Sequence, residues 1–140
     1  EAEVLYKKAI SLLKITLPDT HAWVANSYYG LGKALIEMKD YQSAEINLRY
    51  ALQIRREIYP KENHLIYIAE GDLGISLFYQ NKLSEAEKLL LAAYNGNKNT
   101  ENITITNSQR FAEYLLKLYE QTKNKEKTAY YKNLLQRSQK

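Results

Sequence analysis

The chain has 140 residues, enough for one domain with a continuous core, and 45% of its residues are hydrophobic. The absence of cysteine excludes disulfides, thiolate metal sites and cysteine nucleophiles, and no apolar run approaches the roughly 18 residues of a membrane span. The formal net charge is +4, and residues 121–140 carry six basic residues against one acidic residue, Glu126. Charge gathered at one end is typical of a solvated terminal helix and argues against nucleic-acid binding, which needs a positively charged face.

Apolar residues recur at helical spacing along most of the chain, and the breaks between these stretches predict seven helices. The predicted helices cover about residues 1–16, 20–38, 41–58, 63–80, 83–96, 104–122 and 125–138, with ends uncertain by about two to four residues. Pro18 and Pro60 mark two of the breaks, because proline favours a helix stop followed by a new start. The polar segment 95–102 contains Gly96 and is expected to be a mobile loop.

The sequence resembles itself every 42 residues. Ala44-Glu45 aligns with Ala86-Glu87, and Leu31-Gly32 aligns with Leu73-Gly74. A period of this length indicates stacked helical units that present a surface. We therefore expect a single repeat domain over residues 1–140. It divides into the second helix of a truncated repeat (1–17), two full repeats (18–59 and 60–101) and a divergent C-terminal capping repeat (102–140). Because the chain starts inside a repeat, we read it as a fragment of a longer protein.

Each unit resembles a tetratricopeptide repeat. The first helix of such a repeat carries a large residue, a leucine, a small residue and a large residue, and the second carries alanine, a bulky residue and alanine. Here these are Tyr28, Leu31, Gly32 and Leu35, followed by Ala44, Leu48 and Ala51. The period exceeds the usual length of about 34 residues and is similar to that of kinesin light chains. The resemblance implies an all-α, right-handed superhelical solenoid of antiparallel helix pairs.

A narrower resemblance concerns the C-terminal half of the chain. The run from Ala86 to Tyr94, then Leu115, Leu118 and Tyr119, looks like the closing repeats carried behind bacterial serine/threonine kinase domains. It implies a regulatory or signalling protein, with a kinase domain in the same parent chain, although no kinase residues are present here. We expect a cytoplasmic location, and an extracytoplasmic one stays open if the parent chain has an upstream membrane span.

In tetratricopeptide arrays the first helices line a concave groove. Counting along each helix from its small residue predicts that groove to carry aromatic, aliphatic and charged side chains, which suit peptide binding. We expect both isoleucines of the set to be exposed and therefore to need a partner or an adjacent helix. The predicted partner-binding residues are Asn26, Tyr29, Lys33, Glu37, Ile68, Ile75, Tyr79, Arg110, Glu113 and Lys117.

No constellation of acid, base and nucleophile appears, and there is no phosphate-binding glycine loop. His21 and His64 lie at equivalent turns between repeats without a further metal-ligating partner, so we assign them turn or capping roles. Glu45 and Glu87 recur with the period and are interpreted as scaffold residues. The sequence thus predicts no enzymatic activity, no cofactor and no metal site.

Three functions remain open. The leading hypothesis is a protein–protein interaction module that binds a peptide or a helix in the groove, without insertion into a membrane. The second is a structural spacer or a dimerisation segment, in which the chain forms a homodimer. The third is nucleic-acid binding through the basic last helix, which would require Lys123, Lys125, Lys127 and Lys132.

Overall fold

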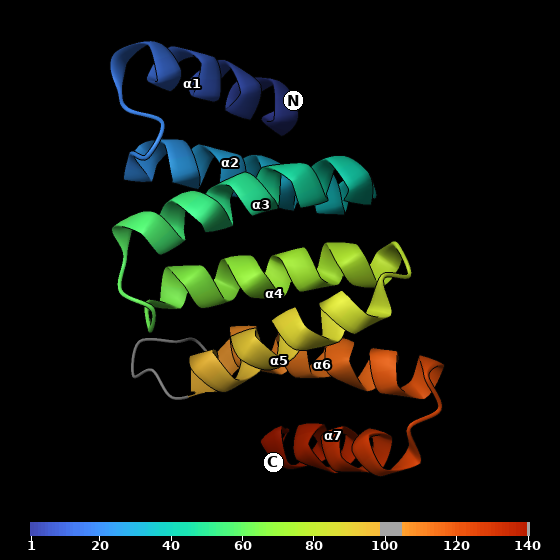
Figure 1. The fold of residues 1–140 in the computed structure, drawn as a ribbon. Helices are drawn as coiled ribbons and strands as arrows, with labels where there is room; N and C mark the ends of the chain where they lie inside the picture. The colour runs from blue at the N-terminus through green and yellow to red at the C-terminus, as the bar shows by residue number, and fades with distance from the viewer. Residues whose placement is uncertain (99–104, 140) are drawn as a thin grey trace.

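The computed structural model describes residues 1–98 and 105–139, and within these ranges every regular element is an α-helix. In chain order the helices are α1 (Ala2–Thr16), α2 (Ala22–Glu37), α3 (Tyr41–Ile58), α4 (His64–Tyr79), α5 (Leu83–Lys98), α6 (Ile105–Gln121) and α7 (Lys125–Ser138). Figure 1 shows them stacked along one direction, with the two termini at opposite ends of the stack. The predicted all-α solenoid is confirmed, and each helix begins and ends within two residues of its predicted bounds.

Side chains next to the turns start several of these helices. The Oδ1 atoms of Asp40, Asn63 and Asn124 accept hydrogen bonds from backbone N–H groups in the first turns of α3, α4 and α7. These bonds satisfy donors that have no partner inside the helix. His21 does the same for α2, because its Nδ1 accepts from the Trp23 N–H at 3.1 Å, which confirms its predicted capping role. His64 is the first residue of α4, and the cap there is Asn63 instead.

The turns inside the three helix pairs repeat with the 42-residue period. Lys39, Asn81 and Lys123 have positive φ angles of 62°, 60° and 59°. At each turn the N–H of the next residue reaches the carbonyl five positions earlier, as in the bond from Asp40 to Leu35 at 2.9 Å. This is the Schellman arrangement, which reverses the chain and satisfies the last carbonyls of the preceding helix. The same reversal at each turn makes α2–α3, α4–α5 and α6–α7 similar hairpins.

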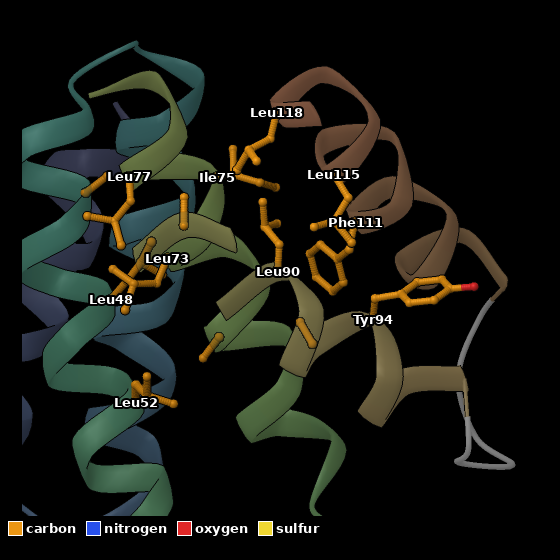
Figure 2. Close-up of a cluster of buried hydrophobic side chains, with 14 of the residues drawn as sticks. Leu48, Leu52, Leu73, Ile75, Leu77, Leu90, Tyr94, Phe111, Leu115 and Leu118 are labelled. Atoms are coloured by element: carbon orange, nitrogen blue, oxygen red, sulfur yellow. The ribbon is translucent and has the colours of Figure 1, made fainter. Parts of the chain in front are cut away.

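Most of the core is one cluster that runs through the stack, and a smaller cluster of Val24, Ala25 and Ile54 lies between α2 and α3. Leu48 packs against Gly32, where an added Cβ would lie 2.6 Å from the leucine Cγ, and Leu90 packs against Gly74, where the distance would be 2.9 Å. Glycine therefore allows the two helices of each hairpin to approach closely. Figure 2 shows Leu90 pointing toward Phe111 and Leu115 of α6, so the same leucine also joins one hairpin to the next.

One sequence expectation about a loop is wrong in part. Residues 95–98 belong to α5, and the rest of the segment predicted to be mobile, 99–102, lies outside the described residues. The helix continues because Gly96 lies under the ring of Tyr67 and Asn97 is buried. Packing against α4 thus outweighs the low helix propensity of an Asn-Gly-Asn segment.

Glu45 and Glu87 connect neighbouring hairpins. Lys82 Nζ lies 2.8 Å from Glu45 Oε2, and Lys127 Nζ lies 3.0 Å from Glu87 Oε1. Tyr119 also donates its hydroxyl to Glu87 at 2.7 Å. These contacts support the scaffold role expected for both glutamates.

Candidate peptide-binding groove

The first helices of the three hairpins, α2, α4 and α6, are joined side by side by polar contacts. The Tyr29 hydroxyl donates to Asp72 Oδ2 at 2.6 Å, which connects α2 to α4. Arg110 Nη2 lies 2.8 Å from Asp72 Oδ1, which connects α4 to α6. We call the surface that these helices share here the groove face. The predicted partner-binding residues all lie on these three helices, and their burial differs widely.

Most of the predicted residues are accessible. Asn26, Lys33, Glu37, Glu113 and Lys117 are exposed. Tyr79 is also exposed, at 43%, whereas Tyr29, Ile68 and Arg110 are half-buried.

Ile75 is the exception. Its side chain is only 2% exposed and belongs to the main core cluster. Figure 2 shows it facing Leu118 and Leu115 of α6, so the adjacent helix covers it. The expectation that Ile75 is an exposed groove residue is therefore wrong, and only Ile68 of the two isoleucines has accessible surface.

Asp72 is the centre of the polar contacts and was not predicted from the sequence. Its side chain is 1% exposed, and it accepts from Tyr29 and pairs with Arg110. Burial raises the pKa of the Tyr29 hydroxyl, and the Asp72 charge raises it further, so Tyr29 stays neutral. Asp72 aligns with Gly30 in the repeat, so the period gave no sign of it. A lone aspartate in the apolar second half of α4 was the available signal.

Arg55 of α3 contacts the same region of α2, and it was also not predicted from the sequence. It is 2% exposed, its Nη1 donates to the Leu65 carbonyl at 2.7 Å and its Nη2 donates to Asn26 Oδ1 at 3.2 Å. Its guanidinium lies 4.2 Å from the centroid of the Tyr29 ring. Burial lowers the pKa of Arg55. Arg55 aligns with Leu13 of the truncated repeat and with Asn97 of the second full repeat, so the repeat pattern assigns no fixed role to this position.

A second cluster, of aromatic side chains, lies toward the C-terminal end of α4. The rings of Tyr41 and Tyr79 stack with centroids 4.5 Å apart, and the hydroxyls of Tyr79 and Tyr114 lie 3.0 Å apart. Phe78 packs edge-on against both Tyr79 and Tyr114, and Lys117 Nζ lies 4.6 Å from the Tyr114 ring centroid. Burial raises the pKa of Tyr114, and the hydrogen bond with Tyr79 raises it further. This aromatic cluster offers large, preorganised contact area next to a cation.

The described parts of the chain were also searched for metal-binding clusters and for membrane-spanning helices. Within residues 1–98 and 105–139, no three His, Asp or Glu side chains gather into a group that could hold a metal ion. In the same ranges, no helix combines the length and apolar character needed to cross a bilayer.

Comparison with known proteins agrees with this architecture. Residues 1–57 match the family model of the tetratricopeptide repeat. No curated protein sequence is significantly similar to the chain.

Solved structures extend the comparison to nearly the whole chain. BtubC (BKLC) from P. vanneervenii superposes with a TM-score of 0.87 at 13% identity, over 96% of this chain and 54% of that one. A putative kinesin light chain from Podosopora anserina, with nearly identical TPR-like repeats, superposes with a TM-score of 0.74 at 15% identity, over 96% of this chain and 63% of that one. The chain thus spans little more than half the length of one and less than two thirds of the other. Residues 1–57 thus match the tetratricopeptide repeat, and nearly the whole chain shares the helical-repeat fold of these two solved structures.

Proposed function

We propose that the chain is a non-catalytic protein–protein interaction module whose groove face binds a peptide or a helix of a partner. Tetratricopeptide repeats generally mediate contacts between proteins, and the matched family supports that class of function. The observation that carries the proposal is the preorganisation of the groove face. Tyr29 and Tyr79 are both fixed by neighbouring side chains, and each keeps accessible surface. Rigid aromatic anchors of this kind lose little conformational entropy when a partner binds.

Two features favour an extended segment as the ligand. The accessible polar side chains are distributed along three parallel first helices instead of converging on one deep cavity. Lys33 and Lys117 lie near the rings of Tyr29 and Tyr114, at 5.7 and 4.6 Å from the centroids, so a cation accompanies an aromatic surface at two separate places. A ligand that contacts both places must run across the helices.

The test uses a peptide selected for binding to the chain. A random peptide library is panned on the purified protein, and the Kd of an enriched peptide is measured by fluorescence anisotropy for Lys33→Ala and Tyr79→Ala. We expect each variant to weaken binding about 5- to 30-fold, in line with the loss of an interface anchor. Tyr29→Phe removes only the hydroxyl that bonds to Asp72, so it is expected to have a smaller effect.

The controls lie on the second helices, away from the groove face. Lys88 of α5 is exposed, and Tyr50 of α3 is 52% exposed and stacks on Tyr28, so Lys88→Ala and Tyr50→Ala match the two groove variants in kind. Circular dichroism checks that every variant keeps its helix content. Equal Kd values for the wild type and both groove variants, or a loss confined to the control variants, would reject the groove as the binding surface.

A further inference from the structure

The sequence contains one Asn-Gly pair, Asn95–Gly96, and the structure places it inside α5. Asparagine followed by glycine is prone to deamidation, because glycine has no side chain to hinder its backbone nitrogen from attacking the preceding side-chain amide. Asn95 is exposed, so its amide is open to solvent. The backbone conformation of the helix, and not burial of the amide, therefore controls this reaction.

Packing against α4 requires glycine at position 96. A Cβ added there would lie 2.4 Å from ring atoms of Tyr67, which is closer than Cβ contacts in proteins, so a larger residue does not fit. The preceding hairpin has the opposite sizes at the equivalent positions, with Ile54 on the second helix and Ala25 on the first, both in one buried cluster. The large side chain has thus moved from the second helix to the first. This exchange of sizes leaves glycine directly after Asn95.

The helical backbone keeps the two reacting atoms apart. In an α-helix ψ is held at about −42°, and each side chain leaves the backbone in the direction of the N-terminus of the helix. Cγ of Asn95 is therefore directed away from the nitrogen of Gly96, which follows it. The attack requires local opening of the last turn of α5, and helix ends open at a lower free energy than helix centres. The contact between Tyr67 and Gly96 must be broken in that opening.

We infer that Asn95–Gly96 is a self-modification site, at which opening of the last turn of α5 allows deamidation and the Tyr67 ring restrains that opening. In the open turn the backbone nitrogen of Gly96 attacks Cγ of Asn95 and a new C–N bond forms. The side-chain amide nitrogen leaves as ammonia and takes the proton of the Gly96 N–H. Water then opens the succinimide ring at either of its carbonyls, which yields aspartate or isoaspartate at position 95.

Both products weaken the end of α5. A carboxylate at position 95 lies in the last turn, where the helix dipole disfavours negative charge. Isoaspartate also adds a methylene group to the main chain, so the hydrogen-bond ladder of the helix cannot continue through it. Gly96 then no longer lies in register under Tyr67. Each opening that ends in reaction thus makes the loosened end of the helix permanent.

The experiment follows the intact chain by mass spectrometry during incubation at mildly alkaline pH. Trypsin releases residues 89–98, and fragmentation of this peptide distinguishes a mass increase at position 95 from one at Asn97. We expect deamidation of Asn95 to be at least about tenfold slower in native buffer than in guanidinium chloride, where the helix is unfolded. Asn81 is the internal control, because the side chain of Lys82 after it hinders the same attack in the unfolded chain.

Variants at position 67 test the restraint. Tyr67→Ala removes the ring above Gly96 and is expected to speed deamidation in native buffer about 3- to 10-fold, because the last turn opens more often. Tyr67→Phe keeps the ring and is expected to leave the rate unchanged. Hydrogen exchange of the Gly96 amide measures the opening directly and should rise by the same factor as deamidation. Tyr67→Ala combined with Gly96→Ile rebuilds the pair of sizes found at Ala25 and Ile54, so it is expected to keep α5 helical and Asn95 unmodified.

Three results would overturn the inference. They are no deamidation of Asn95 in the unfolded chain, equal rates in the native and unfolded chains, and an unchanged rate in a folded Tyr67→Ala variant whose Gly96 amide exchanges faster. Circular dichroism checks the fold of each variant. If Tyr67→Ala does not fold, the wild type decides in low concentrations of guanidinium chloride. There, deamidation and Gly96 exchange should rise together, and a deamidation rate that stays constant while exchange rises would contradict control by opening.

Discussion

At the scale of single residues, the three turns inside the helix pairs have a backbone conformation that their side chains disfavour. Lys39, Asn81 and Lys123 have the left-handed backbone that favours glycine, yet none is glycine. A non-glycine residue in this region carries a steric cost of roughly 1–2 kcal/mol, which asparagine tolerates better than lysine. The 42-residue period identifies these positions as equivalent, but only the structure shows that they share a positive φ angle.

This predicts that glycine stabilises the chain at the lysine turns. Lys39→Gly and Lys123→Gly are expected to raise the free energy of unfolding by about 0.5–1 kcal/mol, because relief of strain exceeds the added chain entropy of glycine. Asn81→Gly should raise the free energy of unfolding by less, because asparagine tolerates this conformation better than lysine. Urea unfolding measures the change, with Lys88→Gly in the interior of α5 as the control, where glycine should cost about 1 kcal/mol. Destabilisation at both turns equal to that at Lys88 would contradict the role assigned to φ.

At the scale of the elements, helix positions were predictable because three local signals agree. Apolar spacing, the prolines at 18 and 60, and the polar residues at the turns all mark the same boundaries. What the sequence could not supply are contacts between elements. Ile75 lies at a groove position by counting along α4 but is covered by α6, and Asp72 and Arg55 acquire their roles only through neighbours on other helices. The helices that carry the predicted partner-binding residues were therefore predictable, but the polar network that joins these helices was not.

One contact between elements should give a pH-dependent stability. Glu87 of α5 accepts from Tyr119 of α6 and pairs with Lys127 of α7. The Tyr119 hydrogen bond lowers the pKa of Glu87; burial opposes that shift, and Lys127 adds to it. A carboxylate with a lowered pKa stabilises the fold above its unfolded pKa of about 4.3, and the contribution disappears as the pH falls through the lower folded value.

The corresponding variant is Glu87→Gln. Its free energy of unfolding should fall less than that of the wild type as the pH is lowered from about 5 to about 3, because the titrating group is gone. Tyr119→Phe, which removes one donor and keeps the carboxylate, should lie between the two. Urea unfolding at a series of pH values measures the profiles. Parallel profiles for the wild type and Glu87→Gln would show that this carboxylate is not linked to folding.

At the scale of the whole molecule, burial increases toward the middle of the stack. Ten residues of α4 are buried, whereas α1 and α7 each have one buried residue. In a solenoid each unit is stabilised by its neighbours, so the central helix is the most firmly held. The groove face is built on that helix, with α2 and α6 on either side of it and the polar contacts of Asp72 joining all three. The proposed binding surface thus has a rigid centre.

We propose that this face, and not the opposite one, receives the partner. The most direct measurement is an NMR map of backbone shift changes when the selected peptide is added to the isotope-labelled chain. We expect the largest changes on α2, α4 and α6, with Asn26, Lys33, Tyr79 and Lys117 among them. Changes concentrated on α3 and α5, or on the basic residues of α7, would contradict it.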